Sequence, residues 1–211
     1  MIHTTVDPLF SMPVYSAGFE LDDSIVNSII DSTIFHRINS NDGYISEDKY
    51  LLENPNNKVL KNIVDYHVEN FLHNILHINR KYDFYLLNSW MIKHNKGDYA
   101  PKHYHNHSLF SGIMYLVCDD DSGDIVFRKS LTGTGFAPSM FEFKIDEYNI
   151  FNSDSWTFTP QPKQILIFPS SLEHEVLPST SNNLRYCVPF NVFVKGEFGE
   201  DDGEKIARLS L

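Results

Sequence analysis

The chain has 211 residues, a formal net charge of −11 at pH 7 and two cysteines. This length is enough to bury a sizeable core as one domain without disulfides, and a 14% aromatic content favours a packed sheet. The acidic charge disfavours nucleic acid as a ligand, and every apolar run is too short to cross a bilayer. We therefore expect a cytoplasmic protein with no nucleic-acid or membrane partner, in which Cys118 and Cys187 are reduced and buried.

The first part of the chain predicts two amphipathic helices. In residues 22–38 apolar side chains recur at helical spacing behind two acidic residues, and residues 58–80 carry a longer apolar stripe. The intervening residues 40–57 are rich in Asn, Asp and Ser, which is typical of a loop. Because each stripe forms one face, we expect both helices to pack against a sheet.

From residue 83 onward, short runs of β-branched and aromatic residues alternate with Gly, Pro, Asn and Asp. These runs predict strands near residues 83–93, 109–118, 123–129, 139–145, 155–160, 164–169, 174–177 and 184–194. Short strands at such close spacing form a sandwich, a barrel or a jelly roll. Residues 196–204, near the end of the chain, are polar and acidic, and we expect them to be exposed.

Three histidines, His103, His105 and His107, stand at alternate positions just before the predicted strand 109–118. In an extended segment, alternation places them on one side. Either His103 with His105 or His105 with His107 could then reach one metal, and imidazole suits Fe, Zn, Cu or Ni. A polar loop with incidental histidines is the alternative.

A further histidine, His174, follows the apolar run 164–169, and Arg185 lies eleven residues later in an otherwise apolar strand. Burying a guanidinium without an anion costs roughly several kcal/mol. We therefore expect a carboxylate to meet Arg185, either from the chain or from a ligand. A surface arginine with a buried stem is the alternative.

These motifs resemble the 2-oxoglutarate/Fe(II) oxygenase superfamily, and in particular a branch found in bacteria and tailed phages. The resemblance covers nearly the whole chain and is carried by His103-x-His105, Ser-Gly-Ile-Met-Tyr-Leu at 111–116, Phe168-Pro169, His174, Arg185-x-Cys187 and Phe190-Asn191. If the protein is phage-encoded, the host cytoplasm is its expected location.

The resemblance implies an α+β fold, a double-stranded β-helix (a cupin-like jelly roll) with the N-terminal helices on the outer face of the major sheet. The mouth lined by histidines would stay open. It implies a single domain with a helical N-terminal part at 1–82, a jelly-roll core at 83–195 and a tail at 196–211.

The resemblance also implies Fe(II) and 2-oxoglutarate as cofactors. His103 would be the first metal ligand and His174 the distal one. Arg185 would hold the C5 carboxylate of 2-oxoglutarate, because its planar fork accepts a carboxylate bidentately. The other residues expected at the co-substrate are Tyr115, Asn88 and Cys187.

The chain departs from the usual His-x-Asp motif of the superfamily, because His105 stands where a carboxylate is expected. We expect His103, His105 and His174 to form the catalytic metal set and His107 to point away. Three histidines leave the same open metal positions as two histidines and a carboxylate, with one more unit of positive charge. Asp98 could supply a carboxylate only if its loop folded back.

The leading functional hypothesis is a dioxygenase that hydroxylates a small molecule or a protein side chain and releases succinate and CO2. One alternative is a cupin-like three-histidine metalloprotein that does not use 2-oxoglutarate. Another is a non-catalytic jelly roll with a binding or structural role. The sequence leaves the substrate and the oligomeric state open, with a homodimer among the alternatives.

Overall fold

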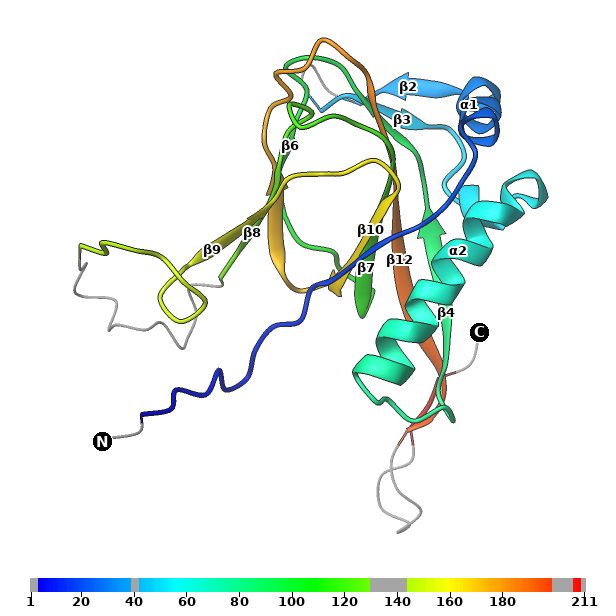
Figure 1. Cartoon of the computed structure of the whole chain (residues 1–211). Helices are drawn as coiled ribbons and strands as arrows, with labels where there is room; N and C mark the ends of the chain where they lie inside the picture. Colours follow the sequence, from blue (N-terminus) through cyan, green and yellow to red (C-terminus); the bar gives the residue numbers. More distant parts are fainter. Residues whose placement is uncertain (1–3, 39–41, 130–143, 199–206, 210–211) are drawn as a thin grey trace.

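The computed structural model describes residues 4–38, 42–129, 144–198 and 207–209, and within them two antiparallel β-sheets pack face to face (Figure 1). The strands of the major sheet are β1 (Tyr15–Gly18), β2 (Phe35–Arg37), β3 (Tyr44–Ser46), β4 (Asp83–Ser89), β5 (Ile92–His94), β7 (Phe110–Val117), β10 (Gln164–Pro169), β12 (Arg185–Phe198) and β13 (Ala207–Leu209). Those of the minor sheet are β6 (Ala100–His103), β8 (Ile125–Arg128), β9 (Ser155–Phe158) and β11 (Glu173–Val176).

The major sheet runs in the order β1-β10-β7-β12-β5-β3-β2, with β4 and β13 paired to the later part of β12. The minor sheet runs β6-β11-β8-β9. Strands distant in the sequence are thus neighbours in both sheets, as in a jelly roll. The structure confirms the predicted α+β fold, a double-stranded β-helix.

Strand β7 shows how the sheet separates two cores. Alternate side chains of a strand point to opposite faces. Met114 and Leu116 pack on the outer face with the helices, whereas Ile113 and Tyr115 pack between the two sheets. The near-continuous apolar sequence of this strand therefore reflects burial on both faces.

Two helices cover the outer face of the major sheet, as predicted. They are α1 (Asp23–Ser32) and α2 (Lys58–Glu69), which continues into a π-helical turn, η3 (Asn70–Ile75). Leu60 and Val64 of α2 are fully buried in the outer core. Figure 1 shows α2 running beside β4 and β12, on the side of the molecule away from the minor sheet. None of the helices in the described ranges is long and apolar enough to span a membrane.

The N-terminal prediction was wrong in detail. The first helix ends at Ser32 and the second helical run at Ile75. Thr33 is extended and its hydroxyl donates to the carbonyl of Ile29 at 2.7 Å, which closes α1. Residues that follow pair as the hairpin β2–β3 instead of extending the helix. The predicted loop 40–57 contains β3 and two short 3-10 helices, η1 (Leu51–Glu53) and η2 (Pro55–Asn57).

Later strands differ less from the prediction. The expected strand 83–93 is divided into β4 and β5, and most of the expected strand 139–145 lies outside the described residues. The predicted tail begins inside a strand, because β12 continues to Phe198 and its end pairs with β13. Strand β6, which carries the first histidine, was predicted only as an extended segment.

Candidate metal centre and its cavity

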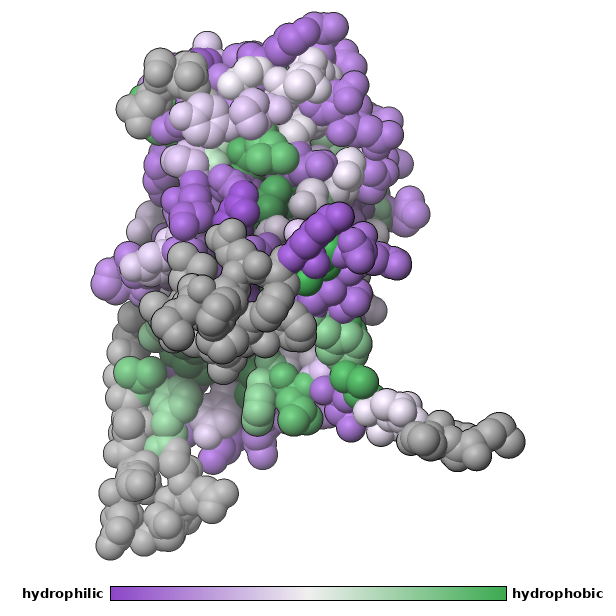
Figure 2. All heavy atoms as spheres, turned by 90° about the vertical axis from the view of Figure 1, so that its left-hand side faces the viewer, coloured by the Kyte–Doolittle hydropathy of each residue, from purple (hydrophilic) through white to green (hydrophobic). Residues whose placement is uncertain are grey.

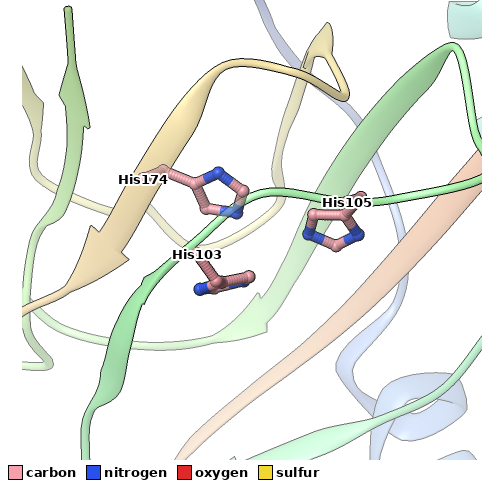
Figure 3. A group of neighbouring side chains, drawn as sticks. All are labelled: His103, His105 and His174. Carbon is pink, nitrogen blue, oxygen red and sulfur yellow. The ribbon is translucent and has the colours of Figure 1, made fainter. Parts of the chain in front are cut away.

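His103, His105 and His174 form one cluster at the mouth of the jelly roll (Figure 3). His103 ends β6 and lies directly opposite His174 of β11 in the antiparallel register. His105 follows β6, where its backbone N–H donates to the carbonyl of Ser170 at 2.9 Å. One ring nitrogen from each histidine lies within 4.8 Å of the others. Such a cluster could hold a metal ion.

Backbone carbonyls fix the tautomers of two of these histidines. The Nδ1 atom of His103 donates to the carbonyl of Pro101 at 2.6 Å, and the Nδ1 atom of His174 donates to the carbonyl of Leu172 at 2.9 Å. A carbonyl can only accept, so Nδ1 carries the proton in both rings. Nε2 is then left with a free lone pair, which is the form that binds a metal.

His105 is oriented by side chains. Its ring hydrogen-bonds the side chain of Asn191, whose Oδ1 also accepts from the Ser111 hydroxyl at 2.7 Å. The Asn191 amide in turn donates to Oδ1 of Asn88 at 2.7 Å. The indole of Trp90 lies nearly parallel to the His105 ring, with the ring centroids 6.5 Å apart. His105 is thus supported by a polar network and an aromatic neighbour.

Burial keeps two of the imidazoles neutral. It lowers the pKa of His174 to about 3 and is also the main cause that lowers the pKa of His105 to about 4, with a smaller effect from nearby His103. A metal binds the neutral ring, so protons compete weakly for these ligands near pH 7.

A cavity of about 280 Å³ extends from the three histidines into the space between the sheets. Arg185 and Cys187 of β12 line it together with His94 of β5. Apolar side chains, including Ile113 and Phe168, form other parts of its wall. The metal cluster and a buried cation therefore share one cavity.

Arg185 is 1% exposed and has no salt bridge to a carboxylate of the described residues. Its guanidinium donates to the carbonyls of Ser122 and Gly123 at 3.2 and 3.1 Å and contacts Sγ of Cys187 at 3.8 Å. It lies 5.5 Å from the ring centroid of Tyr115. These neutral contacts leave the charge of Arg185 without a counter-ion among the described residues.

Three buried polar side-chain atoms in the described ranges lack a hydrogen-bond partner: Nε of Arg185, Oη of Tyr115 and Nδ1 of His94. They come from adjoining strands. Arg185 is directly opposite His94, and Cys187, two residues along β12, is directly opposite Tyr115. Burial raises the pKa of Tyr115, so its hydroxyl stays a donor. A ligand with a carboxylate would satisfy donors that the chain leaves unpaired.

The other predicted residues lie apart from this set. Asn88 is outside the cavity lining, in the network that supports His105. His107 is exposed and outside the histidine cluster. Asp98 is 3% exposed and pairs with Arg37 at 2.9 Å, so it too is outside the cluster.

Sequence reasoning missed two residues of the site. His94 occupies the β5 position opposite Arg185, and only the strand register reveals that neighbour. Asn191 was noted for its resemblance to a closing Phe-Asn motif, but its contact with His105 was not foreseen. For Asn191 the available signal was a polar residue in an apolar strand, whereas the short sequence of β5 gave no such signal for His94.

The match to known families agrees with this geometry. Residues 88–191 match the family described as "Putative 2OG-Fe(II) oxygenase". No curated protein matches the chain. Over these residues, just under half of the chain, the protein is recognised as a member of the 2OG-Fe(II) oxygenase superfamily, whose members use Fe(II) and 2-oxoglutarate.

Solved structures show the same fold at low sequence identity. An oxidoreductase of the 2OG-Fe(II) oxygenase family from Burkholderia pseudomallei has a TM-score of 0.56 and 14% identity, over 81% of this chain and 76% of that one. A Trichoplax adhaerens prolyl hydroxylase, in complex with a hypoxia inducible factor peptide fragment, has a TM-score of 0.57 and 14% identity over 85% and 83%.

The epimerase SnoN, in complex with Fe3+, alpha ketoglutarate and nogalamycin RO, has a TM-score of 0.61 and 8% identity, over 94% of this chain and 91% of that one. These similarities show a shared fold. They give no support to a phage origin for the chain.

Proposed function

We propose that the chain is an Fe(II)- and 2-oxoglutarate-dependent dioxygenase whose metal ligands are His103, His105 and His174. Nitrogen donors of this kind suit Fe(II), and three protein ligands leave three positions of an octahedral metal open. The hydrogen bonds that fix the rings of His103 and His174 support this assignment, because both Nε2 atoms are then free to bind the metal.

The observation that carries the proposal is the group of unpartnered polar atoms around Arg185. Leaving a buried guanidinium without an anion is costly, roughly several kcal/mol. The distal carboxylate of 2-oxoglutarate offers acceptors for Arg185, which lines the same cavity as the histidines, and for Tyr115, whose ring lies beside Arg185. A five-carbon diacid between the two groups would satisfy both.

When bound, iron and 2-oxoglutarate would, together with O2, supply the oxidising chemistry that hydroxylates a substrate C–H bond, with release of succinate and CO2. The side chains of the protein bind and orient the co-substrate and exclude water. Arg185 and Tyr115 bind and orient the diacid, while buried His105 and His174 stay neutral. Apolar walls such as Phe168 exclude water from the cavity.

The size of the cavity limits how much of the substrate can enter it. At about 280 Å³ it lies at the lower end of the range for small-molecule sites. We infer that the co-substrate fills most of it and that only the reacting end of the substrate enters through the mouth. A small molecule and a protein side chain both fit that requirement, and the structures of SnoN and the Trichoplax hydroxylase contain one of each class.

Substrate-free turnover tests the proposal. Iron-loaded protein should convert 2-oxoglutarate slowly to succinate and CO2 in the presence of O2, and His174→Ala should abolish this conversion by removing a metal ligand. A protein that binds iron but neither binds nor consumes 2-oxoglutarate at millimolar concentration would contradict the proposed function.

One observation favours a second candidate. The histidine cluster contains no carboxylate from the described residues, as in a cupin-like three-histidine metalloprotein that does not use 2-oxoglutarate. Arg185 would then hold a different anion. Metal binding with saturable binding of another carboxylate, but none of 2-oxoglutarate, would favour this candidate.

A further inference from the structure

His94 is placed to contact the same ligand as Arg185, and its ring is held in a defined tautomer. Its side chain is buried, at 2% exposure, and lines the cavity directly opposite Arg185. The ring also hydrogen-bonds the backbone of Asp42, in a contact that favours the protonated ring, so the Asp42 carbonyl accepts. Because Nδ1 has no partner, Nε2 makes this bond.

The hairpin β2–β3 holds that arrangement in place. Gly43 has a φ of +78°, and a Cβ there would lie 2.4 Å from Cδ2 of His94. Only glycine lets the turn approach the imidazole so closely. The turn thus fixes Nε2 as the protonated nitrogen of neutral His94 and leaves Nδ1 with a lone pair.

The lone pair on Nδ1 of His94 would repel an anion bound beside Arg185. Nδ1 of neutral His94 can only accept, as can a carboxylate, so the two repel unless a proton lies between them. Protonated His94 would instead donate from Nδ1. Binding of an anion beside Arg185 should therefore be accompanied by uptake of a proton at His94.

We propose that His94 takes up a proton when 2-oxoglutarate binds, so that the affinity for the co-substrate rises as the pH falls. The proposal rests on the function proposed above and adds a pH-dependent partner to the same site. The charged groups that face His94 are Arg185, which disfavours its protonation, and Asp98 and Asp42, which favour it. Asp98 is itself paired with Arg37.

The surroundings of His94 in the protein agree with this proposal. Burial, with help from Arg185, lowers the pKa of His94 to about 4. His94 is therefore neutral near pH 7 in these surroundings. A bound carboxylate opposes both causes by bringing a negative charge to the ring.

Calorimetry measures the proton directly. Iron-loaded, oxygen-free protein is titrated with 2-oxoglutarate in buffers of different ionisation enthalpy at pH 6.5. We expect between about half and one proton taken up per 2-oxoglutarate bound, and an affinity that rises about three- to tenfold per pH unit from pH 7.5 to 5.5. No proton uptake by the wild-type protein would overturn the proposal.

Two variants assign the proton to a residue. His94→Gln should abolish both the uptake and the pH dependence, because its amide does not titrate in this range. His67→Gln is the matched control, since His67 is another buried histidine with a lowered pKa but lies outside the cavity lining. Unchanged uptake in His94→Gln would contradict the assignment.

The outcomes also separate this inference from the function on which it rests. Failure of the wild-type protein to bind 2-oxoglutarate would overturn both. Binding of 2-oxoglutarate without a proton at His94 would overturn this inference alone.

Discussion

At the histidine cluster, neutral oxygen acceptors orient the imidazoles. Carbonyls of Pro101 and Leu172 hold His103 and His174, and Asn191 holds His105. Such partners choose the tautomer and the direction of the ring without adding charge. The three proposed ligands would therefore bring no negative charge to a divalent metal, and an anionic co-substrate would be left to supply it.

Substitutions at Asn191 test whether its side chain orients the ring of His105. Asn191→Leu should weaken metal binding about 10- to 100-fold, because His105 loses the acceptor that fixes its ring. Asn191→Asp keeps an oxygen at that place and should retain most of the affinity. Metal titration of both variants checks the prediction, and equal affinity of Asn191→Leu and the wild-type protein would contradict it.

Arg185 should act on the co-substrate rather than on the metal. A charge-assisted hydrogen bond contributes about 1.5–3 kcal/mol, so Arg185→Ala should weaken 2-oxoglutarate binding about 10- to 150-fold. Arg185→Lys should recover part of the loss, since lysine cannot form the bidentate pair. Binding titrations measure both effects, with unchanged metal content as the control for folding. Wild-type affinity in Arg185→Ala would rule out this role.

The buried histidines also predict how stability depends on pH. His94, His105 and His174 have a pKa of about 4, 4 and 3 in the folded protein, whereas an unfolded histidine titrates near 6.5. Between these values the unfolded chain binds more protons, so their stabilising effect is present above about pH 6.5 and is lost as the pH falls. Chelator-treated protein should lose more than about 1 kcal/mol of stability from pH 7 to 5.

Thermal denaturation with and without added metal checks this prediction. Added metal should raise the stability at both pH values but leave the loss nearly unchanged, because burial already keeps the rings of His105 and His174 neutral in the metal-free protein. Equal stability of the metal-free protein at pH 7 and pH 5 would show that these rings are not held neutral.

Among the elements, the hairpin β2–β3 connects the fold to the site. Its strand β3 pairs with β5, which carries His94, and its turn contacts the His94 ring. Arg37 of β2 pairs with buried Asp98 in the β5–β6 loop, where Asp98 also accepts from the backbone N–H of Asn95 at 2.8 Å. Ile38 and Asp42, which lie between the two strands of the hairpin, also line the cavity that contains Arg185.

Asp98→Asn should separate this structural role from metal binding. Loss of the charge weakens a partly buried ion pair and should lower the free energy of unfolding by about 1–3 kcal/mol. It should also weaken 2-oxoglutarate binding, because the turn beside His94 loosens. Metal content should not change. A loss of metal comparable to that of His103→Ala would instead make Asp98 a ligand.

The sequence predicted best those elements whose hydrophobic pattern is complete within their own residues. Helix α2 has a full apolar stripe, and β7 and β10 are buried on both faces. Strands β1, β2 and β3 are short and mostly half-exposed, and they are strands because of their partners in the sheet. No local pattern encodes such pairing, so β2 was predicted as helix and β3 as loop.

Across the whole molecule, some residues of the site belong to a local sequence motif, whereas others meet only because distant strands pair. The histidines at 103 and 105 form a local motif, and the resemblance brought His174 and Arg185 to them. His94 and Arg185 meet only through the register of β5 and β12. The contact between His105 and Asn191 likewise joins distant segments. Sequence patterns pointed to the three histidines that the fold brings together, whereas the groups that contact and orient them could be identified only from the fold.

The N-terminal strands support a single folding unit. Strand β1 pairs with β10 at one edge of the major sheet, and β3 pairs with β5 toward the other edge. The first part of the chain thus completes the sheet formed by later strands, beyond the helical cover that was predicted. We propose that residues 4–209 fold as one domain on this basis.

One spectroscopic titration tests the histidine centre and the co-substrate together. Chelation of Fe(II) by a 2-oxo acid produces a visible charge-transfer absorption, so 2-oxoglutarate added to iron-loaded, oxygen-free protein should give a saturable band. His103→Ala should remove the band, and Arg185→Ala should shift it to about 10- to 150-fold higher 2-oxoglutarate. A wild-type protein that shows no band at millimolar 2-oxoglutarate, or a His103→Ala variant that keeps it, would contradict the proposed centre.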